Sequence, residues 1–174
     1  TPTHLVAAVQ AGLFETPGSE NPHVSRLYIG TFVTVDQLIG EWAYLKPHGE
    51  PLANAMPGGW MRTDRLLPLT NLPTSEETRR QAILGTAFRM KGVPYLWGGC
   101  ATNGIDCSGF AQWLHRLVGI ALPRDADLQF QAGRPVEPPF QPGDLLFFAE
   151  PGDARAITHV TVSTGGASTM IWSY

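Results

Sequence analysis

The pattern of apolar and polar positions changes near residue 72. Before that point, short apolar runs alternate with turn clusters: HLVAAV, RLYIGTFVTV, EWAYL and GGWMR with TPGSENP, KPHGEP and NAMPGG. Short apolar runs bounded by Gly, Pro, Asn and Ser are typical of β-strands joined by turns. We therefore predict a small all-β barrel over residues 1–72. Burial in the barrel core is the default prediction for its aromatic residues Trp42, Tyr44 and Trp60.

From Leu72 onward, helical spacing replaces this pattern. A capping box of Thr74 and Glu77 opens a predicted helix over residues 75–91, which ends at Gly92 before Pro94. Its buried face comprises Ile83, Leu84, Ala87, Phe88 and Met90. A second helix is predicted over residues 107–118, where Phe110, Trp113, Leu114, Leu117 and Val118 recur at helical spacing before Gly119.

The remaining elements predict the fold class of residues 73–174. A short helical turn follows Asp125 and stops at Gly133, and the runs DLLFF, AITHVTVS and STMIWS read as strands. Helices followed by strands, without β-α-β alternation, indicate an α+β unit with an antiparallel sheet.

Cys107 combines with this pattern to suggest a reaction. It begins the predicted helix in GIDCSGF, where free backbone N–H groups and the positive end of the helix dipole stabilise a thiolate. In ITHVTV, strand alternation places His159 and Thr161 on the face opposite the valines. If that face meets the helix start, His159 becomes a base for a cysteine nucleophile.

Each of these residues also has a simpler interpretation. A lone cysteine is usually a small buried apolar residue, and a lone histidine is usually packed or exposed. The polar and small neighbours Asp106, Ser108 and Gly109 are unlike the surroundings of a core thiol, and they favour the catalytic hypothesis.

Composition excludes several classes of partner and cofactor. The 174 residues have a net charge of -3, which gives no basic footprint for nucleic acid or anionic lipid. No apolar run approaches the roughly 20 residues that span a bilayer. Neither a Cys-x-x-Cys pair nor His-rich spacing indicates zinc, and we expect no metal or organic cofactor. We expect Cys100 to be a reduced turn residue, because a bridge to Cys107 would consume the nucleophile.

Five segments in this order resemble the NlpC-type family of cysteine peptidases, which cut bacterial cell-wall peptides: GVPYLWGG, GIDCSGF, LPRDAD, QPGDLLFF and THVTV. The resemblance covers residues 75–172 and implies a papain-like α+β core. Residues 1–72 resemble the bacterial SH3-like barrels that often precede this domain. The resemblance to NlpC-type peptidases further implies hydrolysis of the amide between γ-D-glutamate and a diamino acid in peptidoglycan stem peptides or muropeptides. The peptides that such enzymes cut often have a free N-terminal L-alanine.

The resemblance also implies roles for individual residues. Cys107 is the nucleophile, His159 the general base, and Tyr95 a donor to the oxyanion or the substrate. Asp106, Ser108, Arg124 and Asp125 resemble substrate-binding positions, and Glu41 and Tyr44 are predicted to contact the peptide from the barrel. Alternatives stay open: Tyr95 as a packed aromatic, Asp106 and Asp125 as helix caps, Arg124 as a surface neighbour, and Glu41 and Tyr44 as surface or core residues.

One position departs from the family pattern. The polar residue that orients the catalytic imidazole aligns with Ile171 or Trp172, neither of which supplies a side-chain acceptor. Three explanations stay open: substitution by a backbone carbonyl or Ser173, truncation of the peptidase domain at the C-terminus, or an impaired enzyme. The alternative functions are therefore a peptide-binding protein without activity, or another thiol-dependent amidase or acyltransferase. The chain starts at Thr1 without Met, so a processed form stays open. The compartment also stays open between the bacterial cytoplasm and the cell envelope.

Overall fold

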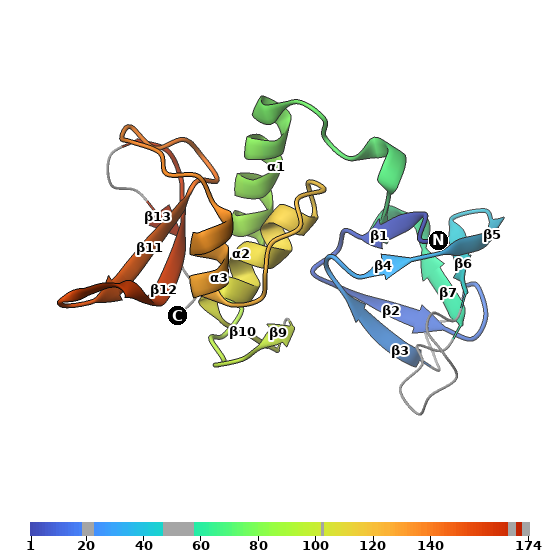
Figure 1. Cartoon of the computed structure of the whole chain (residues 1–174). Helices are drawn as coiled ribbons and strands as arrows, with labels where there is room; N and C mark the ends of the chain where they lie inside the picture. The colour runs from blue at the N-terminus through green and yellow to red at the C-terminus, as the bar shows by residue number, and fades with distance from the viewer. Residues whose placement is uncertain (19–22, 47–57, 102, 167–169, 172–174) are drawn as a thin grey trace. The chain divides into compact units, whose positions relative to one another are not determined.

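The structure is a computed structural model that describes residues 1–18, 23–46, 58–101, 103–166 and 170–171. The chain divides into two compact units, Thr1–Leu72 and Pro73–Tyr174 (Figure 1). Among the described residues, no helix is long and apolar enough to cross a membrane.

Unit 1 consists of short antiparallel strands, as the runs and turns of its sequence predict. A five-stranded sheet has the order β3-β2-β7-β6-β5, and a three-stranded sheet has the order β4-β1-β8. The strands are β1 (His4–Val6), β2 (Gln10–Phe14), β3 (His23–Tyr28), β4 (Phe32–Val33), β5 (Val35–Ile39), β6 (Trp42–Leu45), β7 (Gly59–Arg62) and β8 (Leu66–Pro68). Two short 3-10 turns cover Thr63–Arg65 and Leu69–Asn71.

The core of unit 1 is aliphatic, so the default placement of its aromatic residues in the core is wrong. Its buried members are Val6, Ala11, Leu13, Leu27, Val33, Ala43, Leu45 and Met61. Side chains alternate along a strand, and in β6 Ala43 and Leu45 point into the core while Trp42 and Tyr44 are half-buried on the other face. The aromatic residues pack on one another instead, with Tyr44 against Trp60 at 5.4 Å between ring centroids.

Unit 2 opens with helix α1 (Glu76–Arg89). The predicted capping box has Thr74 as its N-cap, and the helix starts one residue later than that box requires. The N-cap is Ser75 rather than Thr74, because the Ser75 side chain accepts the N–H of Thr78 at 3.2 Å. Ile83, Ala87 and Met90 are buried as predicted, whereas Phe88 is 59% exposed.

The predicted order of helices followed by antiparallel strands is confirmed. Helices α2 (Cys107–Arg116) and α3 (Ala126–Ala132) pack against strand β12 (Figure 1). The sheet has the antiparallel order β11-β12-β13, formed by Leu145–Glu150, Asp153–Ser163 and Met170–Ile171. A short hairpin of β9 (Cys100–Ala101) and β10 (Gly104–Ile105), which was not predicted, leads into α2.

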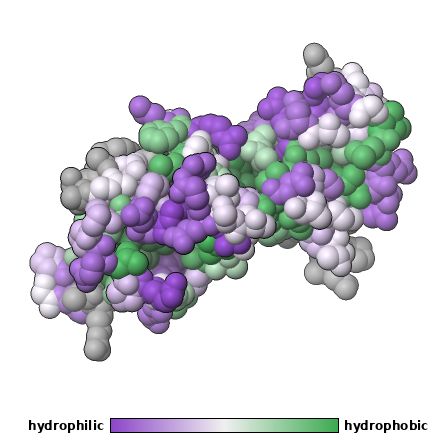
Figure 2. All heavy atoms as spheres, turned by 90° about the horizontal axis from the view of Figure 1, so that it is seen from above, coloured by the Kyte–Doolittle hydropathy of each residue, from purple (hydrophilic) through white to green (hydrophobic). Residues whose placement is uncertain are grey.

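The surface keeps several large apolar side chains in contact with solvent. On the face drawn in Figure 2, hydrophilic and hydrophobic residues are intermingled. Leu38 in unit 1 is 67% exposed, and Trp97 in unit 2 is 83% exposed. Single exposed apolar residues are common and need no functional explanation. Trp97 differs from the others because it lines the pocket described below.

Candidate active site

Cys107 is the first residue of α2, where the helix leaves backbone N–H groups without helical partners. Asp106 is the N-cap, and its Oδ1 accepts the N–H of Gly109 at 2.7 Å. This contact confirms the cap interpretation of Asp106. The Cys107 side chain is buried yet lines a pocket, so its sulfur lies at the positive end of the helix dipole and within reach of a ligand.

Gly109 allows other groups to approach the first turn of α2 closely. A Cβ at this position would lie 2.8 Å from the carbonyl oxygen of Gly99 and 2.9 Å from Oδ1 of Asp106. The glycine of CSGF therefore allows the turn before β9 to approach the start of the helix closely.

A pocket of about 710 Å³ opens at the N-terminus of α2 and brings six of the predicted site residues together. These six residues are Tyr95, Asp106, Cys107, Ser108, Arg124 and Asp125. They come from the turn before β9, the start of α2 and the segment before α3. Thr158 of THVTV also lines the pocket, so the fold gathers four of the five resemblance segments around one cavity.

The Tyr95 hydroxyl stays protonated in this pocket. Burial raises its pKa, and the neighbouring Cys107 and Asp106 raise it further because they would repel a phenolate. Tyr95 can therefore donate a hydrogen bond near the sulfur at neutral pH.

His159 lies on β12 next to the lining of the pocket. Ile157 and Thr158, the two residues before it, line the cavity that contains Cys107. His159 pairs with Phe148 of β11, and the two rings lie 6.1 Å apart between centroids. Burial lowers the pKa of His159 below its ordinary value, so the imidazole is neutral at neutral pH. The pairing of His159 with Cys107 stays a prediction.

The β11-β12 ladder is irregular beside His159. Phe148 pairs with His159 and Ala149 with Ile157, so Thr158 is an extra residue, and a second register shift follows between Ala149 and Glu150. Such bulges redirect side chains and are frequent beside active sites. Further along β12, Val160 pairs with Phe147, whose ring contacts Phe130 of α3.

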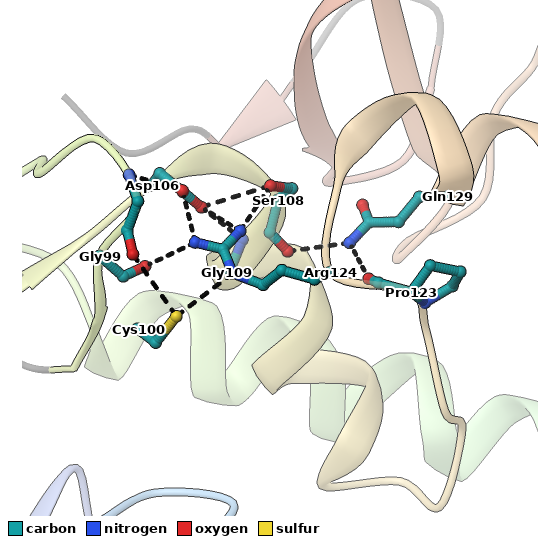
Figure 3. A network of polar contacts seen from close by, with 9 residues as sticks. Gly99, Cys100, Asp106, Ser108, Gly109, Pro123, Arg124 and Gln129 are labelled. Carbon is teal, nitrogen blue, oxygen red and sulfur yellow. Dashed lines mark hydrogen bonds and ion pairs between the residues drawn. The ribbon is translucent and has the colours of Figure 1, made fainter.

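The carboxylate of Asp106 is held by Arg124 (Figure 3). Nη1 and Nη2 of Arg124 donate to Oδ1 and Oδ2 of Asp106 at 3.0 and 2.6 Å. Burial would raise the pKa of Asp106, but the hydrogen bonds from Arg124 and from the N–H groups of Gly109 and Gly98 outweigh burial and lower it. Asp106 is therefore ionised at neutral pH.

The other predicted substrate-binding residues are less well defined. Asp125 is the N-cap residue of α3, as the cap interpretation predicts, but its side chain makes no capping hydrogen bond and lines the pocket instead. In unit 1, Glu41 forms an ion pair with Arg62 at 3.2 Å, and Tyr44 packs on Trp60. The substrate-binding roles of Asp125, Glu41 and Tyr44 stay predictions.

Several residues of the pocket lining were not predicted from the sequence. These are Trp97, Gly98, Ala126, Asp127, Glu150, Ile157 and Thr158. Trp97 and Gly98 belong to GVPYLWGG, Ala126 and Asp127 to LPRDAD, and Thr158 to THVTV, directly after Ile157. Glu150 ends strand β11, which pairs with β12. Membership in these segments, or a position next to them, is the signal that would have suggested these residues. Ile171 pairs with Val162, whereas Trp172 and Ser173 lie outside the described residues. The described residues contain no cluster of His, Cys, Asp or Glu that could hold a metal ion.

Comparison with known proteins identifies the class of this fold and site. Residues 92–173 match the model of the NlpC/P60 family. The solved structure of an NlpC/P60 family protein from Bacillus cereus ATCC 10987 covers 94% of this chain and 52% of its own chain, with a TM-score of 0.76 and 26% identity. Residues 92–173 therefore form an NlpC/P60 family domain.

Two curated relatives carry functional names. A gamma-D-glutamyl-L-lysine dipeptidyl-peptidase of Bacillus subtilis strain 168 is 39% identical over 101 residues, which cover 57% of this chain and 34% of that protein. The bifunctional muramidase/DL-endopeptidase CwlT of the same strain is 39% identical over 87 residues, which cover 49% of this chain and 26% of that protein. The chain thus spans about a third or less of the length of these relatives.

Proposed function

We propose that this protein is a cysteine peptidase that hydrolyses the amide between γ-D-glutamate and a diamino acid in peptidoglycan stem peptides. The observation that carries the proposal is the placement of Cys107 at the capped N-terminus of α2, inside a pocket shared with Tyr95. The names of the two relatives, a gamma-D-glutamyl-L-lysine dipeptidyl-peptidase and a DL-endopeptidase, support this substrate class.

The reaction proceeds in two steps through a thioester. The Cys107 thiolate attacks the γ-carbonyl carbon, and backbone N–H groups at the start of α2 stabilise the oxyanion together with the Tyr95 hydroxyl. His159, which has become an imidazolium by taking the proton of the Cys107 thiol, gives that proton to the leaving amine as the C–N bond breaks. Neutral His159 then takes one proton from water, whose oxygen attacks the thioester carbon. The C–S bond breaks, which regenerates the Cys107 thiolate, and the carboxylic acid that is released gives its proton to solvent.

The charge of the pocket favours a substrate that carries an ammonium group. Asp125, Asp127 and Glu150 line it in addition to Asp106, whose charge is already matched by Arg124. An amine at the peptide N-terminus or on the diamino acid meets this charge pattern favourably. Residues 1–72 are proposed to be an SH3-like barrel, and Glu41 and Tyr44 are proposed to contribute to peptide binding.

Incubation of the protein with defined stem peptides, followed by mass spectrometry, tests the proposal. We expect a product cut after γ-D-glutamate, and we expect Cys107→Ala to abolish it while Cys100→Ser retains it. Absence of product from every stem peptide, with Cys107 confirmed as reduced, would exclude the peptidase. Peptide binding without cleavage would then favour the binding-protein alternative, especially if Cys107 reacts with iodoacetamide only above about pH 8.

A further inference from the structure

The guanidinium group of Arg124 has no free donor for a substrate. Arginine carries five N–H donors, and five acceptors surround this side chain (Figure 3). Nε donates to Sγ of Cys100 at 3.2 Å, Nη1 to Oδ1 of Asp106 at 3.0 Å and Oγ of Ser108 at 2.9 Å, and Nη2 to Oδ2 of Asp106 at 2.6 Å and the carbonyl oxygen of Gly99 at 3.3 Å. These acceptors belong to the turn before β9, to the β9-β10 hairpin or to the start of α2.

Asp106 needs this partner because of its place beside the nucleophile. Its Oδ1 caps α2 through Gly109, and its Oδ2 accepts the N–H of Gly98 at 3.0 Å. Asp106 directly precedes Cys107 and lines the same pocket, so an uncompensated carboxylate there would add negative charge to the pocket in which the sulfur reacts. The bidentate contact with Arg124 compensates that charge and leaves the cap in place.

Gln129 holds the segment of Arg124 against the same helix. Its Nε2 donates to the carbonyl oxygens of Ser108 and Pro123, both at 2.9 Å, and the residue is 1% exposed. Both neighbours are acceptors, so the orientation of the carboxamide is fixed and both of its N–H groups are used. Within the described part of the chain, Oε1 of Gln129 is buried without a hydrogen-bond partner. A buried acceptor without a partner costs free energy of folding, and here it accompanies the two hydrogen bonds by which Gln129 links Pro123 to Ser108.

We propose that Arg124 is a positioning residue for the thiol reaction of Cys107 and does not bind the substrate. It holds Asp106, Ser108 and the hairpin in one arrangement and compensates the charge of Asp106, while Gln129 fixes the segment that carries it. The consequence for catalysis rests on the proposed function, but the effect on the thiol does not.

The test is the pH dependence of Cys107 alkylation by iodoacetamide, read by peptide mass spectrometry so that Cys100 is counted separately. The titratable and charged groups around Cys107 are Tyr95, Asp106, Arg124, Asp125, Asp127 and Glu150 in the pocket lining, with His159 adjacent on β12. The substitution Arg124→Met leaves the Asp106 charge uncompensated. We expect the midpoint of alkylation to move up by about one pH unit, which is about a tenfold loss of thiolate at a pH below the midpoint.

Three further variants separate charge from structure. Asp106→Asn with Arg124→Met removes both charges while Asn still caps the helix, so its alkylation midpoint should return toward that of the unchanged protein. Gln129→Met alters no charge and should lower kcat with little change in the alkylation midpoint. Arg134→Met, at an exposed arginine in the segment after α3, is the charge-matched control and should change neither quantity.

The outcomes of these measurements are distinct. An unchanged alkylation midpoint in Arg124→Met, accompanied by a higher KM at constant kcat, would show a substrate-binding role and overturn the proposal. If Arg124→Met does not fold, Arg124→Lys replaces it: the charge is kept and the bidentate contact is lost, so a smaller upward shift is expected and an unchanged midpoint overturns the proposal. Alkylation requires no peptide cleavage, so failure of the proposed peptidase function would be recognised separately.

Discussion

At the scale of single residues, the state of Cys107 depends on neighbours of opposite effect. The first turn of α2 places backbone N–H groups at Cys107, whereas Asp106 places a carboxylate directly before it in the chain. Asp106 nevertheless supplies the cap, and Arg124 makes the cap compatible with a charged nucleophile. The protonation state of His159 matters in the same way, because only its neutral form accepts a proton.

The first prediction concerns the acid limb of activity. Burial lowers the pKa of His159 from 6.5, so its neutral form predominates at lower pH than that of a free imidazole. We predict that kcat/KM on a stem peptide rises as the pH increases through a value below 6.5 and is level by about pH 7. Measurement between pH 5 and pH 8 gives the profile.

The matching substitution is His159→Gln, which removes the base and should lower kcat/KM by about a hundredfold or more. His4→Gln is the control, because burial also lowers the pKa of His4, which belongs to unit 1. Normal turnover by His159→Gln would remove His159 from the mechanism.

Sequence reasoning found the residues whose signal is local. Cys107 and its cap Asp106 are adjacent in the chain, and the helical spacing after them shows where the helix starts. The partners of Arg124 lie 16 to 25 residues before it, and the tertiary fold is what brings them to it. No local pattern reveals that its donors are all used.

At the scale of elements, the start of α2 is held in place by its contacts with the β9-β10 hairpin and with the turn before it. The hairpin contributes the sulfur of Cys100 to Arg124, and the turn directly before it contributes the carbonyl oxygen of Gly99, which lies beside the helix start. The helix was predictable because its apolar face repeats over ten residues. The hairpin was not, because strands of two residues are too short to show a period.

The second prediction tests this contact with Gly109→Ala. The new methyl group would lie 2.8 Å from the Gly99 carbonyl oxygen, so the hairpin or the first turn must shift. A small displacement of a reacting group has a large effect on rate, and we expect kcat/KM to fall about tenfold or more.

Gly85→Ala in α1 is the matched control for steady-state kinetics. A Cβ at Gly85 meets no atom within 4 Å, and alanine is the better helix former. This variant should keep full activity and gain about 0.5–1 kcal/mol of stability. Equal activity of Gly109→Ala and Gly85→Ala would show that close approach at Gly109 is unimportant.

At the scale of the whole molecule, each unit has its own buried residues. The boundary between the units falls between Leu72 and Pro73. Strand patterns in the sequence predicted the all-β character of unit 1 but misplaced its aromatic residues. Alternation within β6 gives the reason, since the small Ala43 and the aliphatic Leu45 take the inward positions that Trp42 and Tyr44 were expected to fill.

The third prediction tests the aliphatic core of unit 1. Leu13 is fully buried in it, and Leu13→Ala should destabilise the unit by about 2–5 kcal/mol. Amide hydrogen exchange, read by mass spectrometry, should show faster exchange in β2, β3 and β7. Leu38→Ala, at a leucine that is 67% exposed, should change stability by no more than about 0.5 kcal/mol. Similar exchange in both variants would contradict the assignment of this core.

The extra residue Thr158 in the β11-β12 ladder limits how this protein can be redesigned. Side chains alternate between the two faces of a strand, so deleting Thr158 would remove the register shift between Phe148 and Ala149 but turn Ile157 to the opposite face. Ile157 would then leave the pocket lining. Loop grafts that alter specificity should therefore preserve the number of residues between Glu150 and His159, even where they replace every side chain between them.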